Sequence, residues 1–508
     1  MGFVKASGQE LMLDGKTILL RGFGLGGWFL PEGYMWKLYG KCDRPRRLEA
    51  LIEGLCGEAY AGRFWREYGE RYITQGDMEL IAKQGFNSVR LPINARHLAQ
   101  EETLLRIDRL IAWCKKHGLL VILDMHGAPG GQTGTNIDDC EADRPELFEN
   151  PAYRQELTDL WRMLARRYRN ETTVAGYDLI NEPLPEWFSG YNAMVLPLYR
   201  QLMQAIREED QNHLIIVEGV HWATDFSIFE PLQNEPLDDN CILQFHKYWS
   251  NPDRESILPY LQYRERLNMP LFKGEGGENN LEWYTAVFPL YERENISWSF
   301  WSYKKMDCTN SPVTFPRPEG WEELIRHLDG EQQLESRRAQ QIFDGFLQAI
   351  AKPQINPGVF RALKREAPVS IPAEHYDACS AVSQRMPEAE YRMEDGLTIL
   401  FANGKTGKPN YQRYGGESQP EEENLVVRLL PGDSASYRFL GSREGVVALT
   451  AKGPGVLSLR IGIWHEAFEI PAGWHALPAL FTRPESGECM LTVTCINGEV
   501  LLDDIGIQ

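Results

Sequence analysis

Residues 88–126 read SVRLPINARHLAQEETLLRIDRLIAWCKKHGLLVILDMH, which is a strand, a helix and a second strand in succession. The two ends are short apolar runs, and the middle, Leu104–His117, carries apolar residues at i, i+3 and i+4 spacing. Two strands joined through an amphipathic helix form a parallel βαβ unit. This stretch therefore predicts an α/β fold with a parallel sheet.

The same alternation of strand and helix continues over about the first 350 residues. Eight such units are typical of a (β/α)₈ TIM barrel with its helices outside. The predicted strands are Ile18–Gly24, Ser88–Ile93, Leu119–Met125, Gly176–Ile180, Leu214–Glu218, Ile242–Phe245, Pro270–Gly274 and Ile296–Ser302.

The pattern changes after Pro368, where short strand-like segments are separated by turn clusters such as PGD and KGPG. Just before it, AKPQINPGVF carries two prolines and a glycine, which is typical of a linker. We predict a (β/α)₈ barrel domain over 1–352, a linker over 353–368 and a smaller all-β sandwich of jelly-roll type over 369–508.

The composition is that of an ordinary globular protein, with 43% hydrophobic residues among 508. The chain has 53 Lys and Arg against 72 Asp and Glu, a net charge of −19, which argues against binding to nucleic acid or an anionic membrane. The nine cysteines form no CxxC pair, so no zinc ribbon or redox motif is indicated. We expect a soluble monomer, and both a cytoplasmic location and secretion with an absent signal peptide stay open.

In barrels of this kind, functional residues lie at the C-terminal ends of the strands. A lone glutamate there is more often a helix-terminus carboxylate or a salt-bridge partner. Polar or aromatic groups on six strand ends are harder to explain in that way, and they predict a site in the barrel mouth. These residues are Arg90, Asp124, His126, Asn181, Glu182, His246, Tyr248, Glu275 and Trp301.

Glu182 and Glu275 follow the fourth and seventh strands, which lie across the mouth from each other. Two facing carboxyl groups are the arrangement that glycoside hydrolysis needs, one to protonate the leaving oxygen and one to attack or to activate water. A separation of about 5 Å gives retention of configuration, whereas about 6.5–9.5 Å leaves room for water and gives inversion. The sequence leaves this distance open.

Seven motifs between residues 18 and 305 together resemble glycoside hydrolase family 5, and two of them are most similar to its exo-β-1,3-glucanase branch. The motifs are RGFGLGGWFLPE, NSVRLP, LDMHGAPGGQTG, YDLINEPLPE, HKYW, KGEGG and WSFWSYKK. The resemblance implies a retaining barrel hydrolase that acts on a β-glucan polysaccharide or oligosaccharide and needs no metal or other cofactor.

The resemblance also implies roles for individual residues. Glu182 would be the acid/base and Glu275 the nucleophile. A cation at Arg90 would hold Glu275 ionised, and Tyr248 would donate a hydrogen bond to the same carboxylate. Asn181 matches the family residue that holds the sugar 2-hydroxyl.

His126 and His246 match the histidines of the family's pocket; metal binding is the rival interpretation, but no third ligand pattern accompanies them. Trp301 matches the aromatic platform under the reacting sugar, with core packing as the alternative. Core packing is favoured for Trp298. The resemblance further implies a cis peptide bond between Trp301 and Ser302.

Glu32 matches a carboxylate that binds the outer hydroxyls of a terminal glucose and so favours exo action; a surface glutamate is the alternative. Thr135 stands where that branch has an aromatic clamp, and the insertion Pro31–Glu70 has no counterpart. The predicted activity is therefore a retaining exo-β-1,3-glucanase. An endo-β-1,4-glucanase or β-mannanase is the second candidate, and a non-enzymatic glycan-binding barrel is the third.

The last predicted domain contains LPGDSASYRF and EVLLDDIGIQ, which resemble stretches of jelly-roll carbohydrate-binding modules. Trp464 and Trp474 are its candidate sugar-stacking residues. Core burial is the favoured alternative for both, because IGIW alternates as a buried strand does.

Overall fold

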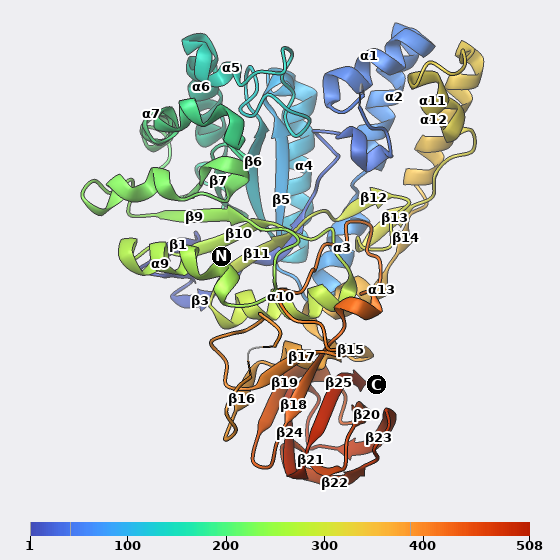
Figure 1. Cartoon of the computed structure of the whole chain (residues 1–508). Helices are drawn as coiled ribbons and strands as arrows, with labels where there is room; N and C mark the ends of the chain where they lie inside the picture. The colour runs from blue at the N-terminus through green and yellow to red at the C-terminus, as the bar shows by residue number, and fades with distance from the viewer. Residues whose placement is uncertain (1, 41, 387) are drawn as a thin grey trace. The chain divides into compact units, whose positions relative to one another are not determined.

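The computed structural model describes residues 2–40, 42–386 and 388–508, which form two compact units (Figure 1). The first unit comprises the chain up to Lys247 together with Pro259–Gly276 and Asn295–Ile355. The second comprises Tyr248–Leu258, Gly277–Glu294 and Asn356–Gln508.

The first unit is built on a closed barrel of eight parallel strands in the order β10-β11-β4-β5-β6-β7-β8-β9, which confirms the predicted TIM barrel. Every one of these strands overlaps a predicted one. They are β4 (Arg21–Gly24), β5 (Ser88–Asn94), β6 (Leu120–Gly127), β7 (Val174–Asp178), β8 (Leu214–Glu218), β9 (Cys241–His246), β10 (Leu271–Glu275) and β11 (Ser297–Phe300).

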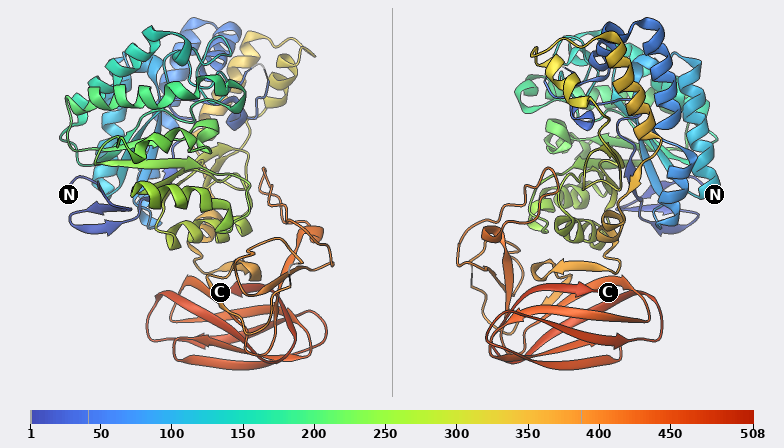
Figure 2. Two further views of the ribbon diagram at one scale, coloured as in Figure 1. Left: turned by 60° about the vertical axis from the view of Figure 1, so that its left-hand side comes forward. Right: turned by 90° about the vertical axis from the view of Figure 1, so that its right-hand side faces the viewer.

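Helices of the first unit cover the outside of the barrel (Figure 2). In α4, the apolar face predicted from the sequence is buried, and the helix ends at Gly118 in the left-handed conformation that glycine adopts without cost. The covering helices include α3 (Gln75–Lys83), α4 (Glu101–His117), α6 (Pro151–Tyr168) and α7 (Val195–Arg207), and α12 (Ser336–Ile350) belongs to the same unit.

A three-stranded antiparallel sheet precedes the barrel and was not predicted. It consists of β1 (Lys5–Ser7), β2 (Glu10–Leu13) and β3 (Lys16–Ile18). Val4 and Leu11 from this region pack in one buried cluster with Leu120, Leu214 and Ile242 at the N-terminal ends of the barrel strands. The sheet therefore closes the end of the barrel opposite the predicted site.

The insertion that follows β4 folds as η1 (Gly33–Trp36), α1 (Pro45–Cys56) and α2 (Glu58–Arg71). Trp36 is fully buried, stacks on Trp65 at 5.9 Å between ring centroids, and meets Phe346 of α12 at 4.5 Å. These aromatic contacts make the insertion an integral part of the first unit. A small sheet of β12 (Lys304–Met306), β13 (Val313–Phe315) and β14 (Gln354–Ile355) and the helix α11 (Trp321–Leu328) complete it.

The second unit contains two antiparallel sheets, as the sequence predicts for its all-β region. One has the order β17-β18-β25-β20-β23, with β15 also pairing β25, and the other has the order β16-β19-β24-β21-β22. The strands are β15 (Val369–Pro372), β16 (Ala378–Ser380), β17 (Thr398–Phe401), β18 (Leu425–Leu429), β19 (Ser434–Gly441), β20 (Glu444–Lys452), β21 (Gly455–Ile461), β22 (Trp464–Ile470), β23 (His475–Thr482), β24 (Gly487–Gly498) and β25 (Val500–Ile507).

The stretch 353–368, predicted as a linker, contains a helix, α13 (Pro357–Lys364), with Val359, Phe360 and Leu363 buried. The second unit also takes in the segment after β9 and the helix α10 (Leu281–Arg293), which the predicted boundaries assign to the barrel domain. The boundaries at residues 352 and 369 stay predictions.

The two tryptophans proposed for sugar stacking differ in burial. Core burial is wrong for Trp474, which is 40% exposed beneath the Lys452 ammonium group, whereas Trp464 is half-buried against Phe481. All nine cysteines are free thiols. Among the described residues, no helix combines the length and apolar character needed to cross a membrane.

Candidate active site

The centre of the barrel mouth is the Arg90 guanidinium group, which is fully buried on β5. Its Nη1 lies 3.1 Å from Asp124 Oδ2, its Nε 2.8 Å from Asp178 Oδ2 and its Nη2 3.0 Å from Glu218 Oε1. Nη1 also pairs with Glu275. Burial by itself would lower the pKa of Arg90, but Asp124 and Asp178 raise it far above its ordinary value, so the group stays charged.

The carboxyl groups around Arg90 do not all ionise easily. Burial raises the pKa of Glu218 to about 8, with Asp178 adding to the rise and His246 opposing it. Burial also raises the pKa of Asp124 far above its ordinary value, against the pull of Arg90. Because like charges in a buried site cannot all ionise, part of this cluster carries protons at neutral pH.

His246 lies between the two glutamates of the predicted pair. Its Nδ1 is 2.7 Å from Glu182 Oε1 and 3.7 Å from Glu275 Oε2. Burial alone would lower the pKa of His246, but Glu218 and Glu275 raise it well above its ordinary value, so the ring is protonated. One carboxyl oxygen of Glu182 and one of Glu275 lie within 4.8 Å of each other and of this ring.

The backbone at Glu182 is unusual, because this non-glycine residue has a φ of 42° and Leu184 has a φ of 58°. Such left-handed residues are strained and persist only where neighbouring groups hold them. The backbone N–H of Glu182 donates to Glu218 Oε2 at 2.7 Å, and that of Leu184 donates to the Gln132 carbonyl at 3.2 Å. Glu218 and Gln132 thus hold the loop that presents Glu182.

The sequence did not predict Asp178, which pairs with Arg90, or Glu218 as residues of this site. Of the two, Glu218 makes more contacts. It is fully buried at the end of β8 and bonds to Arg90, to Gln244 and to the Glu182 backbone. Its signal was present, since it is the last residue of the predicted strand Leu214–Glu218. The predicted site contains no residue from the end of this strand.

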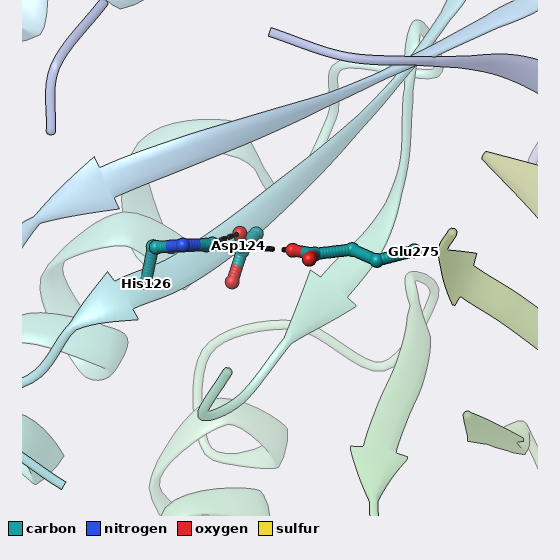
Figure 3. A group of neighbouring side chains, drawn as sticks. All are labelled: Asp124, His126 and Glu275. Carbon is teal, nitrogen blue, oxygen red and sulfur yellow. Dashed lines mark hydrogen bonds and ion pairs between the residues drawn. The ribbon is translucent and has the colours of Figure 1, made fainter. Parts of the chain in front are cut away.

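His126 lies beside Asp124 and Glu275 of the carboxylate cluster (Figure 3). Its Nδ1 is 2.8 Å from Asp124 Oδ2 and 3.8 Å from Glu275 Oε1, and its Nε2 is 3.4 Å from the Asn181 amide nitrogen. Burial lowers the pKa of His126 to about 4, so the ring is neutral. A neutral ring that donates from Nδ1 to Asp124 can accept from Asn181 at Nε2.

Trp301 stacks on His126 with ring centroids 5.2 Å apart and an interplanar angle of 5°. It is only 4% exposed, and its Nε1 donates to the Tyr34 hydroxyl at 2.9 Å. A Cβ atom at Gly24 or Gly26 would come within 2.5 or 2.7 Å of the indole ring, which explains two of the four glycines of RGFGLGG. The expected cis bond between Trp301 and Ser302 is present, and Trp298 is fully buried as expected.

Glu32 and Tyr248 are the remaining predicted site residues. Glu32 directly precedes η1 and is 2% exposed, so the surface-glutamate alternative is wrong. Tyr248 follows His246 by two residues and belongs to the second unit, where its ring packs at 5.3 Å from Trp249. Its hydrogen bond to Glu275 stays a prediction.

Two groups of side chains among the described residues place three potential ligand atoms close enough for a metal ion. They are Asp124–His126–Glu275, drawn in Figure 3, and Glu182–His246–Glu275. In the first group, Arg90 already supplies a positive charge to Asp124 and Glu275. In the second group, the protonated His246 supplies it to the two glutamates. The donor chemistry therefore favours proton transfer and charge stabilisation over metal ligation.

Comparison with known proteins identifies the family. The model of the cellulase family, glycosyl hydrolase family 5, matches residues 54–307, which is half of the chain. The chain belongs to glycosyl hydrolase family 5. It is therefore a glycoside hydrolase, and the third candidate, a non-enzymatic glycan-binding barrel, is set aside.

Curated relatives within this family have several activities. A β-xylosidase of Phanerodontia chrysosporium is 28% identical over 345 residues, covering 60% of this chain and 71% of its own. An endoglucanase C of Acetivibrio thermocellus is 27% identical over 314 residues, covering 48% and 88%. A probable glucan 1,3-β-glucosidase A of Neosartorya fischeri is 28% identical over 241 residues, covering 45% and 57%.

Proposed function

We propose that this hydrolase cleaves β-glucosidic bonds with retention of configuration and releases glucose from the ends of β-1,3-glucan. The observation that supports retention is the closeness of Glu182 and Glu275, since one carboxyl oxygen of each lies within 4.8 Å of the other and both flank His246 Nδ1. Retaining enzymes hold their two carboxyl groups about 5–5.5 Å apart, whereas inverting enzymes need about 6.5–9.5 Å to admit water.

The surroundings of the two carboxyl groups support different roles. Glu275 pairs with the permanently charged Arg90, which favours a carboxylate that attacks the anomeric carbon. Glu182 is held instead by His246 and by the strained loop after β7. In the first step, Glu182 gives its proton to the leaving oxygen while Glu275 forms the glycosyl ester. In the second step, Glu182 removes a proton from the water that breaks this ester.

Asn181 supports the same mechanism. Its Oδ1 accepts from Arg90 Nη2 at 2.8 Å, which fixes the amide and directs its Nδ2 away from the guanidinium group. An amide held in this way is suited to donate to the sugar 2-hydroxyl, where hydrogen bonds strengthen in the transition state.

Exo action is supported by the burial of Glu32 and by some of the relatives. A buried carboxylate after β4 would recognise the outer hydroxyls of a terminal sugar, and a probable glucan 1,3-β-glucosidase is among the relatives. The endoglucanase relative keeps an endo-β-1,4-glucanase as the second candidate, and the β-xylosidase relative makes xylose the alternative sugar to assay.

In this proposal, Trp187 and Trp222 bind the sugar units that depart as the leaving group. Trp187 is 67% exposed in the loop after Glu182, and its ring meets the half-buried Trp222 ring at 5.7 Å and 65°. His221, Trp222 and Ala223 have φ of 55°, 61° and 59°, a conformation that costs about 1–2 kcal/mol per non-glycine residue. The backbone N–H of His221 donates to the Leu184 carbonyl at 2.8 Å, which ties this strained turn to the Glu182 loop.

Replacing either proposed catalytic glutamate separates the two roles. Glu275→Ala is expected to abolish hydrolysis, and Glu182→Ala to lower kcat about 10²–10⁴-fold. Azide should restore turnover in Glu182→Ala and give the β-glucosyl azide, because it attacks the glycosyl ester without needing a base. Product anomers are assigned by NMR, with Glu186→Ala in the same loop as the control. Near-native hydrolysis by either variant would reject these roles.

The products from laminarin and carboxymethyl-cellulose, followed over time, test exo against endo action. Wild type should release glucose alone from laminarin from the first minutes. Glu32→Gln removes the charge but keeps the shape, so kcat/KM should fall about 10-fold or more, whereas the exposed control Glu53→Gln should be unchanged. A spread of oligosaccharides, or activity only on the β-1,4 polymer or on aryl β-xyloside, would contradict the proposed specificity.

The leaving-side role of the tryptophan pair is tested with two substrates. Trp187→Ala and Trp222→Ala should each lower kcat/KM on laminaritriose by about 3–10-fold, since aromatic contacts contribute about 0.5–1.5 kcal/mol beyond their area. β-Glucosyl fluoride has no leaving sugar, so its kcat/KM should not change. Equal losses on both substrates would indicate a structural role, and no loss on the trisaccharide would remove these residues from the substrate site.

A further inference from the structure

A cavity of about 300 Å³ lies in the second unit, apart from the residues of the proposed reaction. It is formed by the start of α10, the end of β15 with the residues after it, the segment 411–424 and the last strand, β25. None of the described residues that line it is Lys or Arg. Its acidic lining residues are Glu282, Glu374, Glu421, Asp503 and Asp504.

A β-bulge brings two of these carboxylates to the same face of β25. Thr450 of β20 pairs with Asp504 and the next residue, Ala451, pairs with Leu502, so Asp503 has no partner on β20. Leu502 and Ile505 are both buried although they are three residues apart, and Asp503 and Asp504 are both half-buried between them. In a regular strand, neighbouring side chains point to opposite faces. The bulge therefore lets both aspartates line the cavity, and bulges commonly re-aim side chains in this way.

Buried polar atoms without partners also line the cavity. Glu374 is 5% exposed, and its Oε2 has no hydrogen-bond partner among the described residues. His375 is 2% exposed, and in the same described part of the chain neither ring nitrogen has one. A buried polar group left without a hydrogen bond costs about 1–3 kcal/mol, and a ligand with donors would satisfy it.

The carboxyl groups destabilise one another's charges. Burial raises the pKa of Glu374 far above its ordinary value, and Asp503 and Glu282 add to the rise. Burial raises the pKa of Asp504 to about 6, against the hydrogen bond that Ser370 donates to it at 2.6 Å. A positive charge in the cavity would relieve this repulsion.

The geometry suits an organic cation better than a bare metal ion. Among the described residues, three potential metal ligands come within 4.8 Å of one another only in the barrel. The cavity is also about ten times the volume of a water molecule. Side-chain amides of Asn280, Gln419 and Asn424 also line it, and Asn424 Nδ2 donates to Asp503 Oδ1 at 2.8 Å. Each amide can make more than one hydrogen bond, so a fitting ligand carries hydroxyl groups besides its charge.

We propose that this cavity binds an amino sugar, with the protonated amino group among Glu374, Asp503 and Asp504 and the sugar hydroxyls against the side-chain amides.

Calorimetric titration with glucosamine tests the site, with glucose and N-acetylglucosamine as controls that keep the ring but lack the positive charge. Glucosamine should bind and the neutral sugars should not. Because the barrel also binds sugars, the titration is repeated in Glu275→Gln, where binding should persist. Asp504→Asn and Glu374→Gln should each weaken binding at least 10-fold, whereas Glu466→Gln, an exposed carboxylate change on β22, should not.

Four outcomes would overturn the proposal. They are equal binding of glucose, loss of glucosamine binding in Glu275→Gln, unchanged affinity in Asp504→Asn and Glu374→Gln, and no glucosamine binding at all. A rise in unfolding temperature with calcium chloride but not with glucosamine would identify a metal site instead.

If Asp504→Asn does not fold, Asp503→Asn takes its place, because Asp503 occupies the bulge and makes no β20 ladder pair. Hydrolysis is measured in parallel and is expected to be unchanged in all three cavity variants.

Discussion

The site in the barrel depends on one buried interaction, the Arg90 guanidinium group among Asp124, Asp178, Glu218 and Glu275. Removing the cation would leave uncompensated buried carboxylates, which costs several kcal/mol, so the cluster is stable only as a whole. Through Glu275 it connects β5 to β10, and through Glu218 it reaches the Glu182 backbone. Both proposed catalytic carboxyl groups are therefore positioned by the same cation.

The cluster also gives the two carboxyl groups the different surroundings that their proposed roles require. Glu275 is bound directly to Arg90, while Glu182 reaches it only through Glu218 and shares the protonated His246 with Glu275. In the proposed mechanism, the ester on Glu275 removes one negative charge from the cluster before Glu182 acts as the base. The strained φ of Glu182 is maintained by the same cluster.

The barrel was predictable because buried parallel strands are short apolar runs with polar residues at their ends. The β1–β3 sheet was missed because strands of three or four residues give too little alternation to recognise. The sequence predicts a linker where α13 lies, because Pro357 suggests a break in regular structure. Pro357 instead occupies the first turn of the helix, where proline is tolerated. Glu218 was missed because a glutamate that ends a strand resembles any other, and only the contacts with Arg90, Gln244 and the Glu182 backbone distinguish it. The bulge at Asp503 was likewise hidden, since the register of β25 is set by its partners.

The proposed mechanism requires that Glu275 forms a covalent bond to the sugar. Incubation with 2-deoxy-2-fluoro-β-glucosyl fluoride, followed by peptide mass spectrometry, tests this directly, because the fluorine slows hydrolysis of the glycosyl ester. We expect one fluoroglucosyl group per chain, attached to Glu275 in the peptide that contains KGEGG. A label on any other residue, or turnover with inversion and no label, would contradict the mechanism.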